Sequence, residues 1–204
     1  MSLNDKTETY EQIEAREAME KSVSRLNLPP RFNKADLDTF DQSYQPRAFA
    51  MAQEFSKGFT KATARGIYLF GLPGSGKTHL VSAIARTLIP QNVVRFVTVP
   101  ELLLDIKKSF NNSHINDEYL DILGKTQVLI LDDLGSEKPT EWVQETLFVL
   151  LNRRYTHYLP TIITSNCSLD QLAERLGYRI ASRIAEMCDV VELKAVDYRI
   201  RKNK

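Results

Sequence analysis

The stretch Gly71-Leu-Pro-Gly-Ser-Gly-Lys-Thr78 decides the fold class of this chain. It fits the pattern G-x-x-x-x-G-K-[S/T] completely, and that pattern is typical of a loop that wraps around phosphate groups. Residues 66–70, Gly-Ile-Tyr-Leu-Phe, predict a buried strand before it, and residues 77–88 predict a helix after it. Strand, glycine-rich turn and helix is the order that such a loop requires. The sequence therefore predicts an α/β domain with a nucleotide site at this turn.

Each residue type in the loop has a physical role in holding phosphate. Glycines let the backbone wrap closely around phosphate oxygens with its N–H groups pointing inward, and the helix adds its positive N-terminal end. We expect Lys77 to reach the β- and γ-phosphates and Thr78 to bind Mg²⁺ through its hydroxyl. The predicted ligands are ATP or ADP with Mg²⁺, and the predicted nucleotide contacts are Gly71, Pro73, Gly74, Ser75, Gly76, Lys77, Thr78 and His79.

Two further predicted strands end in polar residues. The apolar run 127–131 is followed by Asp132 and Asp133. We expect Asp132 to hold Mg²⁺, directly or through water, and Asp133 to orient or deprotonate the attacking water. The run 161–164 ends next to Asn166, whose side chain could touch the γ-phosphate or the water, although asparagine at this place also forms simple turns.

The rest of the chain alternates short β-rich runs with helical stretches. This alternation predicts parallel βαβ units with helices on both faces of the sheet. Further strands are expected at 93–99 and 190–193, and further helices at 101–110, 115–123, 140–155, 168–176 and 179–187. We expect residues 1–28 to form an acidic leader, helical over 11–25 and ended by Pro29-Pro30, and residues 29–204 to form the ATPase domain.

Composition excludes several classes of protein. The chain has 204 residues, of which 43% are hydrophobic, and it carries 27 Lys and Arg against 26 Asp and Glu. It is too apolar for a disordered protein, and its net charge says nothing about nucleic acid. No run is long enough to span a membrane, and no signal peptide opens the chain. Cys167 and Cys188 form neither a disulfide framework nor a zinc quartet, so we expect reduced thiols in a cytoplasmic protein.

These segments together resemble the AAA+ ATPases, and more narrowly the DnaC/DnaI helicase-loader group, with the IstB-like transposition ATPases as close kin. The resemblance runs from about residue 29 to the C-terminus. It implies a P-loop NTPase core with a five-stranded parallel sheet, strand order 5-1-4-3-2, and no substantial helical lid. It rests on the stretches 71–80, 131–137 (Leu-Asp-Asp-Leu-Gly-Ser-Glu), 151–155 (Leu-Asn-Arg-Arg-Tyr), 161–166 (Thr-Ile-Ile-Thr-Ser-Asn) and 181–184 (Ala-Ser-Arg-Ile).

The resemblance also implies roles for individual residues. Asn166 matches sensor 1, Arg183 matches the arginine finger that enters a neighbouring subunit's ATP site, and Arg199 matches the sensor 2 arginine. Lys107 and Lys108 fall in the extra helical insertion with which the group contacts single-stranded DNA. From the residues alone, Arg183 and the two lysines could equally be solvated charges on helix faces.

The function that the resemblance implies is an ATPase acting at the start of DNA replication as a loader of the replicative helicase. It would assemble head-to-tail, bind single-stranded DNA and contact no membrane. Asp133 stands where many AAA+ proteins have glutamate, which predicts slow hydrolysis, and the match of Arg183 to the arginine finger predicts that hydrolysis depends on assembly. Two alternatives stay open: an IstB-like ATPase that assists a transposase, and, more remotely, a small P-loop kinase.

Overall fold

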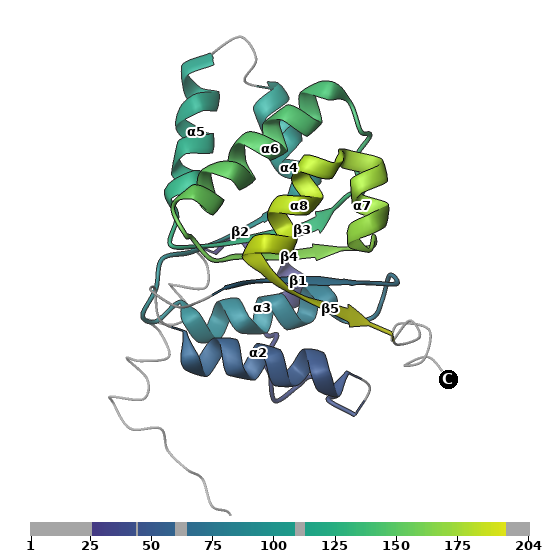
Figure 1. Ribbon diagram of the computed structural model, residues 1–204. Helices are drawn as coiled ribbons and strands as arrows, with labels where there is room; N and C mark the ends of the chain where they lie inside the picture. The colour runs from purple at the N-terminus through teal and green to yellow at the C-terminus, as the bar shows by residue number, and fades with distance from the viewer. Residues whose placement is uncertain (1–25, 44, 60–64, 109–112, 195–204) are drawn as a thin grey trace, which may run out of the picture.

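The computed structural model describes residues 26–43, 45–59, 65–108 and 113–194 of the chain. A parallel sheet runs through its centre (Figure 1). Within these residues the sheet has five strands in the order β2-β3-β4-β1-β5. This is the predicted order 5-1-4-3-2 counted from the opposite edge, so the prediction of fold class is confirmed. The strands are β1 (Gly66–Gly71), β2 (Val94–Thr98), β3 (Val128–Leu134), β4 (Thr161–Ser165) and β5 (Cys188–Leu193).

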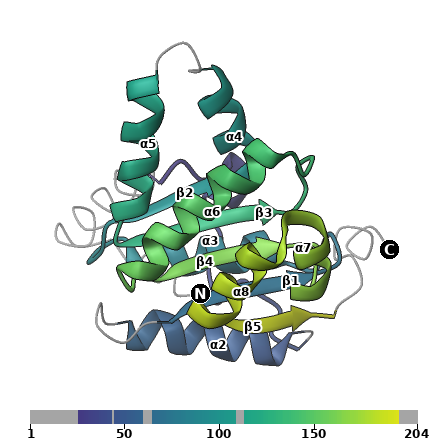
Figure 2. The ribbon, with the colours of Figure 1, turned by 45° about the horizontal axis from the view of Figure 1, so that its top comes forward.

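Helices cover both faces of the sheet (Figures 1 and 2). Because side chains alternate along a strand, β1 sends Ile67 and Leu69 into the core on one face and Tyr68 into the core on the other. The first face carries α2 (Pro46–Gly58), α3 (Lys77–Leu88) and the short 3₁₀ helix η1 (Pro30–Phe32). The second carries α4 (Val99–Lys108), α5 (Ser113–Lys125), α6 (Glu141–Thr156), α7 (Leu169–Leu176) and α8 (Tyr178–Met187).

One helix of the first face, α2, is absent from the sequence prediction. It begins at Pro46, a favoured first residue of a helix, and buries Ala48, Phe49 and Ala52 against the core. Leu26 and Leu28, which the sequence analysis assigns to the leader, are buried in the same core cluster. The predicted leader helix lies outside the described residues.

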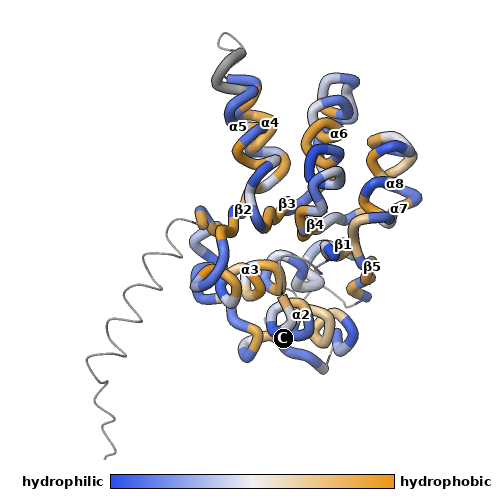
Figure 3. The backbone as a smooth tube through the Cα atoms, turned by 60° about the vertical axis from the view of Figure 1, so that its left-hand side comes forward, coloured by the Kyte–Doolittle hydropathy of each residue, from blue (hydrophilic) through white to orange (hydrophobic). Residues whose placement is uncertain are grey.

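Several predicted boundaries are wrong by a few residues. Helix α4 begins at Val99, where the side chain of Thr98 accepts a hydrogen bond from the backbone N–H of Glu101. Ser113, interpreted from sequence as part of a break, is the first residue of α5. Both helices rise above the sheet on the face that carries α6 (Figure 3). Among the helices that the structure describes, none combines the length and apolar character needed to cross a membrane.

The sequence analysis predicts that this strand ends at residue 131, before the two acidic residues. In the structure β3 continues through both of them to Leu134. Its register against β4 shifts between Leu131 and Leu134, so β3 contains one more residue than its partner over this stretch. Such a bulge bends the strand and redirects its side chains. Asp133 sits in it with a φ of 62°, a left-handed conformation that aspartate tolerates better than most residues.

Candidate functional site

The turn between β1 and α3 approaches its neighbours so closely that only glycine fits at two positions. At Gly71 a Cβ atom would overlap the carbonyl oxygen of Leu193, the last residue of β5. Gly76 has a φ of 98°, and its Cβ would stand 3.0 Å from the ring of Phe40. A backbone that bends in this way, without side chains over it, is suited to close contact with phosphate oxygens.

Lys77 begins α3 and turns its side chain back over this loop. Its Nζ atom donates hydrogen bonds to the carbonyl oxygens of Gly71, at 2.7 Å, and Leu72, at 2.9 Å. It also donates to Oδ1 of Asn166, at 3.0 Å, and the residue is only 7% exposed. These three acceptors are neutral oxygens, and an anionic phosphate oxygen is a stronger acceptor for an ammonium group. The loop therefore holds a buried cation where a phosphate would bind.

The predicted Mg²⁺ ligands lie together. The hydroxyl of Thr78 donates to both carboxylate oxygens of Asp132, at 3.1 and 3.2 Å. Asp132 is 5% exposed, and burial raises the pKa of its carboxyl group. A hydroxyl and a carboxylate are the hard oxygen ligands that Mg²⁺ prefers. These two residues therefore fit the ion that the sequence analysis assigns to them.

Asp133 and Asn166 are brought together with Lys77. The side-chain amide of Asn166 donates from Nδ2 to Oδ1 of Asp133, at 3.1 Å, while its own oxygen accepts from Lys77. One amide thus joins the loop cation to the second acidic residue. All five polar residues predicted from the ends of the strands form one connected site at this edge of the sheet: Lys77, Thr78, Asp132, Asp133 and Asn166.

Thr164 is a residue of this site that sequence reasoning missed. Its hydroxyl donates to Oδ1 of Asp132, at 2.6 Å, and accepts from the backbone N–H of Asp133, at 2.9 Å. It is 1% exposed, so the contacts are shielded from water. The sequence offered one signal for this residue: Thr164 is the last threonine of β4 and stands two residues before Asn166. The hydroxyl holds the two acidic residues at a fixed spacing.

The remaining loop residues differ in exposure. Ser75 is buried, with its hydroxyl 3.5 Å from the Lys77 ammonium, whereas Pro73 is exposed. His79 reaches the segment before α2, where its Nε2 atom lies 3.2 Å from the hydroxyl of Thr39. The ring of Phe40 is close by, with its centroid 5.9 Å from that of the histidine. The first turn of α3 therefore joins this segment to the phosphate loop.

The structure does not bring Arg183 to this edge. Arg183 lies on α8, and its hydrogen bond, ion pair and ring contact are made to Asn152, Glu186 and Tyr155 of α6 and α8. None of these belongs to the phosphate loop or the acidic strand. Arg199 lies outside the described residues.

The two lysines expected at DNA are at the end of α4. Lys107 places its ammonium 5.0 Å from the ring centroid of Trp142 on α6. Lys108 pairs with Asp105 at 3.1 Å and keeps 73% of its side chain exposed. They lie on the helices that rise above the sheet and make no contact with the nucleotide site in the described part of the chain.

The sequence as a whole matches a known family. The sequence model of the IstB-like ATP binding proteins matches residues 7–204. The chain belongs to the IstB-like ATP-binding family. Membership of this family assigns nucleotide binding to the chain, and the phosphate loop described above is the site that fits it.

Relatives of this IstB-like protein include helicase loaders. The uncharacterised protein YqaM of Bacillus subtilis is 35% identical over 186 residues, which cover 82% of this chain and 58% of YqaM. The replicative helicase loader DnaI of the same organism is 34% identical over 139 residues, 65% of this chain and 44% of DnaI. The chain thus spans about half the length of these two curated relatives. A crystal structure of the DnaC helicase loader has a TM-score of 0.73 at 31% identity, covering 81% of this chain and 100% of that one.

These relatives confirm the resemblance to the DnaC/DnaI group and the AAA+ core that the sequence analysis inferred from it. The family is the reason to expect ATP, and the geometry is the reason to expect it between β1, β3 and β4. The roles of individual residues in hydrolysis, assembly and DNA binding stay predictions.

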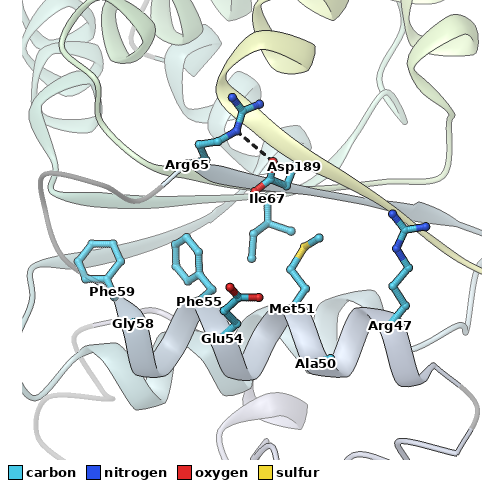
Figure 4. Close-up of a pocket in the computed structure, with 10 residues that line it drawn as sticks. All are labelled: Arg47, Ala50, Met51, Glu54, Phe55, Gly58, Phe59, Arg65, Ile67 and Asp189. Atoms are coloured by element: carbon cyan, nitrogen blue, oxygen red, sulfur yellow. Dashed lines mark hydrogen bonds and ion pairs between the residues drawn. The ribbon is translucent and has the colours of Figure 1, made fainter.

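A separate hollow lies at the opposite end of the strands (Figure 4). It has a volume of about 500 Å³ and is lined by α2 and by the first residues of β1 and β5. Arg65 donates to the carboxylate of Asp189 at its rim, at 3.0 Å. No residue predicted to bind nucleotide, metal or DNA lines it. The hollow therefore lies apart from the nucleotide site described above.

Proposed function

We propose that this chain binds ATP with Mg²⁺ at the edge where β1, β3 and β4 end, and hydrolyses it. The observation that carries this proposal is the amide of Asn166, which joins Lys77 to Asp133. Lysine binds the terminal phosphates and the acidic residue faces the attacking water, so the group between them lies where phosphate and water meet. Asn166 is then sensor 1, and Asp133 is the residue that orients or deprotonates the water.

The other loop residues have supporting roles in the same proposal. Thr78 and Asp132 would hold Mg²⁺, which when bound neutralises charge on the β- and γ-oxygens. The backbone of the turn surrounds the phosphates, with nucleotide contacts from Gly71, Pro73, Gly74, Ser75, Gly76 and His79. Asp133 is one methylene shorter than glutamate, and this supports slow turnover.

We further propose that hydrolysis belongs to an assembly and not to a single subunit. Arg183 makes its contacts on α6 and α8, away from the phosphate loop of its own subunit, and this supports a role in the site of a neighbour. An arginine supplied in trans is worth roughly 10³–10⁵ in rate where it has been measured. Contacts of this head-to-tail kind build rings or open spirals. Arg199, as sensor 2, would act within its own subunit.

The biological role that we propose is that of a replicative-helicase loader. Its support is the similarity to DnaI and DnaC, which are named for that activity. The partners would be the replicative helicase, single-stranded DNA and further copies of the chain. The family match equally supports a second role, as an IstB-like partner of a DNA transposase. It gives no support to a small P-loop kinase.

ATP binding is tested by replacing Lys77 with alanine. Removing the ammonium costs hydrogen bonds to a charged group, each worth about 1.5–3 kcal/mol, so ATP affinity should fall at least about tenfold. Titration with a fluorescent ATP analogue measures this, and the retained thermal stability of the variant without nucleotide serves as its control. Unchanged affinity would refute the site.

The biological role is tested by capture experiments with two baits. The tagged chain is mixed with the replicative helicase of its host and, separately, with a transposase encoded by a neighbouring gene. Each mixture is made with and without ATP. ATP-dependent capture of the helicase by the wild type, and not by Lys77→Ala, supports the loader. Capture of the transposase alone supports the second role and rejects the first.

A further inference from the structure

Arg183 is held by three side chains of α6 and α8. Its Nε atom donates to Oδ1 of Asn152, at 3.1 Å, and its guanidinium carbon lies 4.4 Å from the ring centroid of Tyr155. A carboxylate oxygen of Glu186 lies 3.7 Å from Nη1. The hydroxyl of Tyr155 donates to the other oxygen of Glu186, at 2.5 Å. The guanidinium is thus contacted on its face by a ring and on its edge by an amide and a carboxylate.

Spacing along the helices explains why these side chains meet. Asn152 and Tyr155 are three residues apart on α6, as are Arg183 and Glu186 on α8, so each pair shares one helix face. Arg154, between the first two, points the other way and is fully buried. Within the run Asn-Arg-Arg-Tyr, Arg154 therefore faces the interior, whereas Asn152 and Tyr155 face Arg183.

The contacts leave part of the guanidinium available to an anion. Among the residues that the structure describes, Nη2 of Arg183 has no hydrogen-bond acceptor, and a third of the side chain is exposed. An arginine carries five N–H donors in a fixed planar arrangement, of which Asn152 takes one. The terminal donors can therefore bind a phosphate oxygen while the base of the group stays held.

We propose that Asn152, Tyr155 and Glu186 are positioning residues that hold Arg183 ready to enter the ATP site of a neighbouring subunit. This inference rests on the proposed function of Arg183 in trans. An arginine side chain that is not held in place loses rotamer entropy when it binds a phosphate group. A side chain that its neighbours already hold in one conformation avoids that loss. Correct placement matters as much as charge, because a misplacement of about 1 Å can cost on the order of 10² in rate.

The three residues act through Arg183 and touch no reacting atom. Tyr155 supplies the flat surface against which the guanidinium rests, and Asn152 fixes its rotation about the ring. Glu186 holds the tyrosine in turn. The hydroxyl of Tyr155 donates to Glu186, and this hydrogen bond raises the pKa of Tyr155.

The first test measures kcat at saturating ATP and at a protein concentration where the wild type is assembled. Asn152→Ala and Tyr155→Leu should each lower kcat by about 10- to 100-fold, with ATP affinity unchanged. Tyr155→Phe keeps the ring but loses the hydrogen bond to Glu186, so its kcat should lie between those of the wild type and Tyr155→Leu. Phe148→Leu is the matched control, because Phe148 supports Arg179 in the same way on the same two helices, with the guanidinium carbon 3.9 Å from its ring centroid.

The second test separates positioning from folding by mixing subunits. Tyr155→Leu has an intact phosphate loop, and Lys77→Ala has an intact Arg183. Mixed assemblies should recover activity at the interfaces where these two intact parts meet. A local folding defect in the Tyr155→Leu subunit would persist after mixing.

The outcomes distinguish this inference from the function on which it rests. If Arg183→Ala has the kcat of the wild type, the role in trans is rejected and the positioning role with it. If Arg183→Ala is inactive while Asn152→Ala and Tyr155→Leu keep full kcat, only the positioning role is rejected. Equal losses in Tyr155→Leu and Phe148→Leu, without recovery on mixing, would also overturn it and assign these rings to packing alone.

Discussion

Asp132 and Asp133 are neighbours in sequence with different surroundings. The first is buried against two hydroxyl groups, whereas the second is half-buried and faces the amide of Asn166. The bulge in β3 lets both carboxylates reach one site, because consecutive side chains of a regular strand would point to opposite faces of the sheet. Two chemically identical groups can therefore serve a metal ion and a water molecule side by side.

This division of roles predicts that Asp133→Asn binds ATP as the wild type does but hydrolyses it at least about a hundredfold more slowly, the usual size of a general-base contribution. Asparagine keeps the size of the side chain and removes the proton acceptor. Nucleotide titration and phosphate release, measured on one preparation, check the two halves of the prediction. A parallel loss of affinity and turnover would contradict it.

Asp132 predicts a dependence of stability on pH. Burial raises its pKa above the ordinary 3.8, so the folded chain binds this proton more tightly than the unfolded chain. The resulting stability is present below pH 3.8 and is lost as the pH rises through the raised value. Without nucleotide, Asp132→Asn should therefore melt at a higher temperature than the wild type at neutral pH, with a smaller difference toward pH 4.

The same variant should lose the stabilisation that Mg²⁺ and ATP give the wild type. Thermal melting across pH, with and without Mg²⁺ and ATP, measures both effects. Glu54→Gln, which removes an exposed carboxylate from the hollow at the opposite end of the strands, is the control. A melting temperature for Asp132→Asn at or below that of the wild type at neutral pH would contradict the prediction that burying the charged carboxylate destabilises the fold.

Individual site residues were predictable where the chemistry needs one residue type at one spacing. Lys77, Thr78, Asp132, Asp133 and Asn166 all come from motifs, and the structure joins them. Thr164 was not predicted, because a threonine inside a strand is ordinary and only the register between β3 and β4 reveals its contacts. The role of Asn152 likewise needs the contact between α6 and α8.

At the scale of elements, the strands were predictable because each is a short apolar run beside a turn. Helix α2 was missed because its buried positions are few, and two of the three, Ala48 and Ala52, are small. The end of β3 was missed because charged residues usually end a strand, whereas here hydrogen bonds from Thr78 and Thr164 compensate for burying Asp132. Local pattern therefore identifies an element, and tertiary contacts set its limits.

Arg154 joins three elements and predicts a large effect on stability. Its guanidinium donates to the backbone carbonyls of Leu123, Thr126 and Pro160, at 2.7 to 2.8 Å, and burial lowers its pKa to about 9. In Arg154→Ala the Pro160 carbonyl keeps the backbone N–H of Leu129, but the buried carbonyls of Leu123 and Thr126 lose their donor. At about 1–3 kcal/mol for each, the free energy of unfolding should fall by at least about 2 kcal/mol.

The adjacent arginine is a matched control. Arg153 pairs with Asp121 at 3.2 Å in a partly exposed position, and Arg153→Ala should cost less than about 1 kcal/mol. Urea denaturation of both variants measures the difference. Similar losses for the two would show that the buried hydrogen bonds of Arg154 stabilise the fold no more than a partly exposed ion pair does.

At the scale of the whole molecule, the proposed DNA surface and the nucleotide site lie on different parts of the fold. Helices α4 and α5 rise above the sheet, whereas the phosphate loop lies at its edge (Figures 1 and 3). Lys107 and Lys108 are at the end of α4, where Lys107 lies over the ring of Trp142 and Lys108 pairs with Asp105. A strand of DNA on these helices would therefore leave the ATP site accessible.

Replacing Lys107 and Lys108 together by alanine should weaken ATP-dependent binding of single-stranded DNA and make it less sensitive to salt. Two lost phosphate contacts reduce the slope of log K against log salt by about 1.4. Fluorescence anisotropy at several salt concentrations measures the slope. Lys34→Ala with Lys57→Ala removes the same charge from exposed sites on the other face and should change little. An unchanged slope for the first pair would dismiss the assignment.

The junction between α8 and β5 limits how this protein can be engineered. Helix α8 ends at Met187 and β5 begins at Cys188, with no loop between them. One residue inserted here would slip β5 by one position, exchange the side chains of its two faces and put Glu192 in the buried place of Leu193. It would also displace Leu193 from its contact with Gly71. A tag, label or linker placed at this junction would thus damage the phosphate loop from the far end of a strand.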